Sequence, residues 1–194
     1  MHEPHEPPLH ERILDAAVAF ATESGWYDLR LHLVADRLGL PLATVRAEFP
    51  DADAIANAWF DRALQAMLHA PEEPGFAALP PGERVGAVLL RWFDAQAAHR
   101  RVVGSMLGAK LHPSHPHHWV PLAFDLSRLM HWALEAARLD AHGLARQAEE
   151  VGLTLVFLRA LTLWLRDDSP DQARTRGFLA RNLGWLDRLP RRGG

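Results

Sequence analysis

The chain contains no cysteine among its 194 residues. This absence excludes a disulfide framework, a thiolate metal site and a cysteine nucleophile. Long apolar runs are also missing, because the longest predominantly apolar segment, Val151–Leu165, is interrupted by Arg159. A membrane-spanning helix needs roughly 20 apolar residues, and the first residues lack the basic and then apolar order of a secretory signal. We therefore expect a cytoplasmic protein without stable membrane insertion.

A net positive charge is missing as well, because 21 Lys and Arg residues stand against 24 Asp and Glu residues. The formal net charge is −3 at pH 7, which gives the whole molecule no attraction to a polyanion. Any contact with nucleic acid must therefore come from a local basic patch.

Residue patterns for catalysis or cofactor binding are absent. The sequence has no glycine-rich phosphate loop and no serine elbow motif. The carboxylate pairs Asp167-Asp168 and Glu149-Glu150 are adjacent in sequence, and adjacent side chains on a helix point apart. The sequence therefore predicts that the protein is not an enzyme and has no cofactor.

A histidine-rich segment is the one candidate metal site. His112, His115, His117 and His118 carry imidazoles that could ligate zinc, copper or nickel. The prolines between them prevent a helical pair of imidazoles, and no cysteine or acidic partner is nearby in the sequence. We interpret the segment as a solvated loop and predict no metal site.

What the sequence does contain is helical periodicity. Apolar residues recur every three to four positions over most of the chain, and no useful stretch alternates as a strand does. Gly25, Gly39 and Pro50 mark the ends of three successive helices, and Asp51 or Asp53 can cap a fourth. The pattern predicts an all-α fold of about nine helices.

The composition divides the chain into four expected parts. Residues 1–8 are predicted to be a disordered tail, and residues 9–69 a helix-turn-helix domain. Residues 70–81, which hold four prolines, form an expected linker. Residues 82–190 form an expected helical domain for ligand binding and dimerisation.

The two closing helices predict self-association. The first, about Leu144–Leu165, is apolar nearly all round in its second half, so both faces must be covered. A second copy of the chain is the simplest cover. The last helix is expected from Ser169 to about Leu189. The expected dimer-interface residues are Leu155, Leu158, Gly177, Leu183 and Gly184.

The segment ERILDAAVAFATESGW…VADRLGLPLATVRAEFPDADAIANAWF resembles the N-terminal domain of TetR-family transcriptional regulators. The matching positions follow the family's order and spacing over about the first third of the chain. The resemblance implies that the third helix enters the major groove of DNA. It also implies that two chains pair through their last two helices and that the other C-terminal helices hold a ligand pocket.

The same resemblance places the DNA contacts on the second and third helices. The expected contact residues are Arg30, Pro41, Leu42, Thr44 and Arg46. Only Thr44 is the residue that the family usually has. The positions where family members usually carry serine, threonine, lysine or an aromatic residue hold Leu29, Pro41, Leu42, Arg46 and Ala52.

This N-terminal unit is also acidic. Four basic and six acidic residues lie between Trp26 and Arg62, which gives a formal charge of −2. Phosphate contacts supply most non-specific affinity for DNA, so the unit is electrostatically poor for this task. Arg30 and Arg46 are the cations expected to bind phosphate or guanine edges.

The C-terminal half carries a second resemblance. The string LTLVFLRALTLWLRDDSPDQARTRGFLARNL, with HRRVVGSML upstream, is similar to TetR-fold lipid-binding accessory proteins of ubiquinone biosynthesis. That resemblance implies a vestigial DNA-binding unit and an isoprenoid or lipid ligand. An N-terminal helix cap explains the DDSP part of the string equally well.

Large apolar side chains make a hydrophobic ligand pocket the expected feature of the C-terminal domain. The alternative for each of these residues is that it simply fills the core. The expected lining residues are Trp92, Phe93, Met106, Trp119, Phe124, Met130, Trp132, Phe157 and Trp164. Two functions therefore remain open, a dimeric DNA-binding regulator with a hydrophobic effector and a lipid carrier that does not bind DNA.

Overall fold

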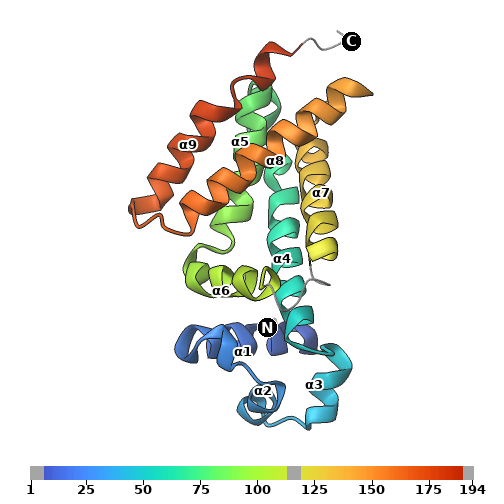
Figure 1. The fold of residues 1–194 in the computed structure, drawn as a ribbon, viewed down its shortest axis with the longest axis vertical. Coiled ribbons are helices and arrows are strands. Elements are labelled where there is room, and N and C mark those ends of the chain that lie inside the picture. The colour runs from blue at the N-terminus through green and yellow to red at the C-terminus, as the bar shows by residue number, and fades with distance from the viewer. Residues whose placement is uncertain (1–6, 113–118, 190–194) are drawn as a thin grey trace, which may run out of the picture. The chain divides into compact units, whose positions relative to one another are not determined.

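The structure is a computed structural model that describes residues 7–112 and 119–189. Within these residues it has nine α-helices and no strand, which confirms the predicted all-α fold (Figure 1). The first six residues of the expected tail lie outside the described residues, as do His115, His117 and His118 of the histidine-rich segment. None of the described helices is long and apolar enough to cross a membrane.

The chain forms two compact units that are not contiguous in sequence. The first unit comprises residues 1–61 and 99–115, and the second comprises residues 62–98 and 116–194. The division expected from the sequence followed chain order and assigned residues 82–190 to one domain. The difference concerns the sixth helix, which packs on the N-terminal helices.

Helices α1, α2 and α3 are the first three helices of the first unit. Helix α1 (Leu9–Ser24) ends at Gly25, whose φ of 100° no other residue adopts readily. Helix α2 (Leu31–Leu38) ends at Gly39 in the left-handed conformation, and the next amide returns to the carbonyl of Ala35 at 2.9 Å. Helix α3 (Leu42–Glu48) follows after a turn of three residues.

Helix α4 (Ala52–Leu68) starts in the first unit and ends in the second. Its first turn is capped by Asp51, whose Oδ1 accepts a hydrogen bond from the backbone N–H of Ala54 at 2.8 Å. Of the two aspartates that the sequence offered as caps, Asp51 therefore takes the role. Phe49, which is 1% exposed, fills the corner between α3 and α4.

Helix α6 (Arg100–Lys110) completes the first unit. It contacts α1 and the 3₁₀ turn Trp26–Asp28. His99 lies before it, with its ring edge-on to Trp59 at a centroid distance of 5.2 Å and its Nδ1 3.1 Å from the Thr22 hydroxyl. The contact between His99 and Thr22 joins segments that are 77 residues apart in sequence.

The second unit packs the end of α4 with four further helices, α5 (Pro81–Asp94), α7 (Trp119–Ala136), α8 (Leu144–Trp164) and α9 (Ala173–Leu183). Helix α8 contacts both α7 and α9, and α5 contacts α9 and α7. The expected linker, residues 70–81, contains two 3₁₀ turns, Ala70–Glu72 and Phe76–Ala78, and Phe76 is buried.

Four aromatic side chains form the centre of the second unit. Phe93 packs at ring-centroid distances of 5.7 Å from Phe157 and 5.4 Å from Trp164, and Trp92 lies edge-on to Phe157 at 5.2 Å. All four side chains are at most 3% exposed. The Trp164 indole N–H donates to Gln172, whose amide NH₂ donates in turn to Asp94 at 2.7 Å. The edge of the aromatic cluster is thus held by successive hydrogen bonds through the Gln172 side chain to Asp94.

Asp167 organises the connection from α8 to α9. Its carboxylate, 1% exposed, accepts hydrogen bonds from the backbone N–H and hydroxyl of Ser169 and of Thr175. The sequence placed the helix start at Ser169 and its end near Leu189, whereas α9 runs from Ala173 to Leu183. The carboxylate that fixes this start is therefore two residues earlier than the predicted cap.

Candidate nucleic-acid interface

The helix-turn-helix of the first unit presents one face of α3 to solvent. Val45 is fully buried against the unit, while Leu42 is 49% exposed. Ala43, Arg46 and Ala47 are exposed as well. These four exposed residues, Leu42, Ala43, Arg46 and Ala47, lie on one side of the helix because their spacing is that of neighbouring turns. We call them the α3 face.

The α3 face has a single charged group. Arg46 is exposed, and within the part of the chain that the structure describes no hydrogen bond or ion pair is assigned to it. A guanidinium in this state has all five N–H donors available. Thr44, the residue that matches the family pattern, is half-buried at the rear of the face, and Pro41 is exposed just before the helix.

Arg30 is held differently, although it was expected to contact DNA with Arg46. Its Nη1 donates to the backbone carbonyls of Tyr27 and Leu29, both at 2.9 Å. The guanidinium is exposed but folded back on its own loop. The hydrogen bonds of Nη1 fix the guanidinium on this loop, so moving it toward a phosphate elsewhere would break two hydrogen bonds, although its other three N–H donors and its charge remain available.

A third arginine of this unit is neutralised locally. Arg37 donates two hydrogen bonds to the carboxylate of Glu23, at 2.6 and 2.9 Å. The hydrogen bonds from Arg37 lower the pKa of the Glu23 carboxyl, and the same bonds raise the pKa of Arg37. Both groups therefore stay charged and paired at neutral pH, which leaves no net positive charge at this position.

Lys110 adds a cation that the sequence reasoning missed. The residue is 6% exposed, and its ammonium group pairs with Asp53 and donates to the Asn57 side chain at 2.7 Å. The ammonium charge is therefore paired within the first unit, with the carboxylate of Asp53 on α4. No short-range pattern signals the contact, because the partners are more than 50 residues apart.

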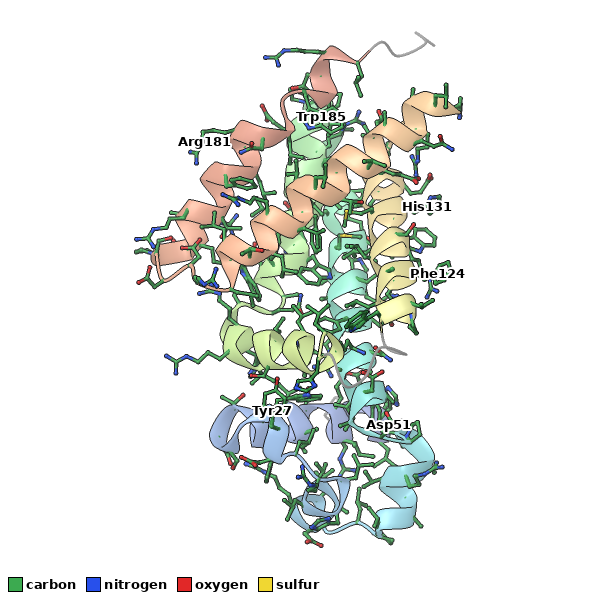
Figure 2. All side chains as sticks on the ribbon, in the orientation of Figure 1. Tyr27, Asp51, Phe124, His131, Arg181 and Trp185 are labelled. Carbon is green, nitrogen blue, oxygen red and sulfur yellow. The ribbon has the colours of Figure 1, made fainter. Side chains whose placement is uncertain are left out.

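The predicted pocket residues fall into two groups. Trp92, Phe93, Phe157 and Trp164 pack on one another in the second unit, where Met130 is also fully buried, and Met106 is fully buried in the first. Trp119, Phe124 and Trp132 are instead 46%, 67% and 42% exposed on α7. Figure 2 shows Phe124 and His131 pointing outward from this helix. The structure therefore gathers four of the nine residues into one cluster.

One polar atom beside the aromatic cluster has no partner among the described residues. Gln96 is 1% exposed, and its NH₂ group donates to the Trp92 carbonyl at 3.1 Å. Its side-chain oxygen is buried and accepts no hydrogen bond. A buried acceptor without a donor is costly, and either a water or a hydroxyl or amide donor of a bound molecule would satisfy this oxygen.

A second exposed stripe runs along α8. Its residues are spaced by four and three positions in alternation, which is the heptad pattern of a helix–helix seam. The stripe residues are Leu144, Ala148, Val151, Leu155, Leu158 and Thr162, and all six are exposed. We call this set the α8 stripe. It includes Leu155 and Leu158 of the expected dimer interface.

The other three residues of that expected interface lie elsewhere. Leu183 is 1% exposed and packs inside its own unit, so it is not on a free surface. Gly177 and Gly184 are half-buried on and after α9. A Cβ at Gly184 would meet nothing within 4 Å, whereas one at Gly177 would lie 3.1 Å from the Arg181 guanidinium.

No metal-binding group is found in the part of the chain that is described. No cluster of three histidine, aspartate or glutamate side chains there has the arrangement needed to hold an ion.

Comparison with solved structures identifies the family. A TetR transcriptional regulator from Nitrosomonas europaea superposes with a TM-score of 0.83 at 35% identity, over 94% of this chain and all of the other. The chain belongs to the TetR family of transcriptional regulators. A TetR regulator from Rhodococcus sp. RHA1 shares the fold with a TM-score of 0.63 at 19% identity, over 91% of this chain and 93% of the other. Mycobacterium smegmatis AmtR shares it with a TM-score of 0.57 at 18% identity, over 95% of this chain and 90% of the other.

Two other comparisons are negative. No protein-family profile matches the chain, and no curated protein sequence matches it. The TetR assignment therefore rests on structure together with the identity to the Nitrosomonas protein. The chain has the N-terminal helix-turn-helix and the helical C-terminal region of the TetR fold.

Proposed function

We propose that this TetR-family protein is a homodimeric transcriptional regulator that places α3 in the major groove of duplex DNA. The observation that carries the proposal is the α3 face, which is exposed and has the unpartnered cation Arg46 among small side chains. Arg can form two parallel hydrogen bonds to the O6 and N7 acceptors of guanine. Thr44, half-buried on the same helix, carries a hydroxyl of the kind that donates to phosphate oxygens.

The α8 stripe supports the dimer. Leu144, Val151, Leu155 and Leu158 are 83%, 62%, 66% and 42% exposed, which leaves a continuous apolar row on one helix. Burying a leucine side chain contributes roughly 2 kcal/mol. Pairing the stripe with the same stripe of a second copy would therefore remove the largest exposed apolar row of α8 from water.

A hydrophobic effector is the third part of the proposal. The aromatic cluster around Phe93 supplies apolar side chains, which a ligand would have to separate because they are packed on one another, and the buried Gln96 oxygen supplies one acceptor beside them. Apolar walls with a few placed polar groups are typical of small-molecule sites. An effector with an aromatic or aliphatic body and one hydroxyl or amide donor fits this chemistry.

The experiment is fluorescence anisotropy on duplex DNA from upstream of the protein's own gene, over a range of salt concentrations. We expect a salt-dependent complex that Arg46→Ala weakens at least tenfold, because a bidentate contact to guanine is worth about 1–3 kcal/mol. Arg166→Ala removes an equal charge from an exposed position of the second unit and is the matched control. Absence of any salt-dependent complex for the parent protein would remove the proposal.

A second candidate function is favoured by the electrostatics of the first unit. Arg37 is paired with Glu23 and Arg30 is held on its own loop by two carbonyls, so Arg46 is the one of these three arginines with no hydrogen bond or ion pair assigned among the described residues. A lipid or isoprenoid carrier without DNA binding would need no such cations. Native mass spectrometry of the purified protein distinguishes the two, because the carrier would retain a lipid and bind a quinone precursor.

A further inference from the structure

We infer that the α3 face reads thymine methyl groups, so that this regulator selects thymine-rich half-sites with one guanine opposite Arg46. The inference rests on the proposed function and specifies its DNA sequence class. It starts from the chemistry of the α3 face, of which three members carry no hydrogen-bonding side chain.

The face is apolar around its single charge. Leu42 and Arg46 lie one turn apart, with Ala43 and Ala47 beside them. Leu42 leaves half of its surface in water and Val45 holds the helix from behind, so the exposed methyl groups are not needed for the core. Leu42, Ala43 and Ala47 therefore form a low apolar ridge, and the guanidinium of Arg46 lies among them.

The major groove offers one apolar feature, the C5-methyl group of thymine. An A·T pair presents the thymine O4 and the adenine N6 and N7 beside this methyl group, whereas a G·C pair presents only donors and acceptors, with which the side chains of leucine and alanine cannot pair. Placing the ridge over those edges would leave their polar groups without water or a partner, which is unfavourable. Thymine methyl groups are therefore the complement of Leu42, Ala43 and Ala47, and guanine is the complement of Arg46.

The small number of cations available for phosphate contacts supports the inference that α3 reads base edges. A family member with several lysines gains affinity from any DNA sequence, but here Arg30 and Arg37 are bound within the protein. Affinity must then come in larger part from the base edges. The salt dependence of binding should be shallow for the same reason, because its slope counts neutralised phosphates.

The test replaces thymine by deoxyuridine, which keeps base pairing and removes only the methyl group. A binding site is first selected from a random duplex pool with the full-length protein. We expect selected sites to be rich in thymine, and each substitution under α3 to weaken binding about three- to fivefold, the value of one buried methyl group. Substitution outside the half-sites should have no effect.

A variant assigns the methyl contact to α3. Leu42→Ala should reduce the preference for thymine over deoxyuridine at one position, while Leu111→Ala, which truncates a 56% exposed leucine elsewhere in the same unit, should leave it unchanged. Equal binding of thymine and deoxyuridine sites would overturn this inference and leave the regulator intact. Failure to select or bind any duplex would overturn both.

Discussion

The ammonium group of Lys110 lies between Asp53 and Asn57, so the last turn of α6 is joined to the first two turns of α4. The lysine is almost enclosed, with its side chain 8% exposed, while that of Asp53 is 35% exposed. Helix α4 begins just after α3, and Lys110 therefore holds the segment that supports the α3 face.

The first prediction concerns the asymmetry of this pair. Asp53→Ala should destabilise the protein by about 2–4 kcal/mol, because it leaves an enclosed ammonium group without its countercharge. Lys110→Met should cost less, about 1–2 kcal/mol, because the carboxylate left behind is partly hydrated. Urea unfolding followed by tryptophan fluorescence measures both values.

The control for this pair is Asp61→Ala, which removes an exposed carboxylate from the same helix. Its effect should stay within about 0.5 kcal/mol. If Lys110→Met proved the more damaging change, the ammonium group would not be the group that depends on its partner.

The second prediction concerns the α8 stripe. Leu155→Glu should weaken self-association at least about a hundredfold, because the substitution appears twice in a symmetric interface and each copy loses roughly 2 kcal/mol of apolar burial. Sedimentation velocity over a range of protein concentrations measures the change. Ala145→Glu places the same charge at an exposed α8 position outside the stripe and should leave the dimer unchanged. A parent protein that is monomeric at every concentration would contradict the expected interface.

The third prediction is a pH dependence that originates at Asp167. Burial of its carboxyl group raises the pKa, but the hydrogen bonds from Ser169 and Thr175 outweigh this effect and bring the pKa from 3.8 to about 2. The stabilisation is therefore complete above pH 4 and is lost as the pH falls toward 2. One pKa unit corresponds to 1.36 kcal/mol, so the group contributes about 2 kcal/mol at neutral pH.

The measurement is the free energy of unfolding of the parent and Asp167→Asn between pH 7 and pH 2. The difference should be about 2 kcal/mol or more at pH 7 and should shrink below pH 4. Asp168→Asn, at the exposed neighbouring position, should show little difference at any pH. A gap between parent and variant that stays constant down to pH 2 would show that the carboxylate charge is not the stabilising factor.

The fourth prediction uses two glycines of α5. A Cβ at Gly82 would lie 2.7 Å from the backbone oxygen of Leu183, whereas a Cβ at Gly86 would meet only a Leu183 methyl group at 3.6 Å. Gly82→Ala should therefore destabilise the protein by about 1–3 kcal/mol, because a backbone must move. Gly86→Ala should be neutral or stabilising by up to about 1 kcal/mol, since alanine favours helix. Thermal unfolding of the two variants should move in opposite directions or differ clearly in size.

The sequence predicted the first helices and α8 well because their ends carry local signals. Gly25 and Gly39 end their helices where positive φ is needed, and the apolar period set the bounds of α8 to within one residue. The resemblance to the TetR family could also be recognised in the sequence, since the residues that carry it lie within one continuous segment, and the comparison with the Nitrosomonas protein confirmed the family.

Contacts between distant segments could not be predicted in the same way. The period of α7 shows that the helix has an apolar side but not how much of it is covered, and Trp119 and Phe124 are exposed in the structure. The pairing of Lys110 with Asp53 depends on how α6 folds back onto α4 within the first unit. Local periodicity contains no information about either fact.

A single unpartnered arginine on α3 has a consequence for how this protein would respond to its own abundance. One chain holding DNA through Arg46 and a few methyl contacts would dissociate quickly. When two chains are joined, the second attachment becomes intramolecular and gains a high effective concentration. Occupancy of an operator would then climb more steeply than the number of chains in the cell, so a modest change in expression would act as a threshold.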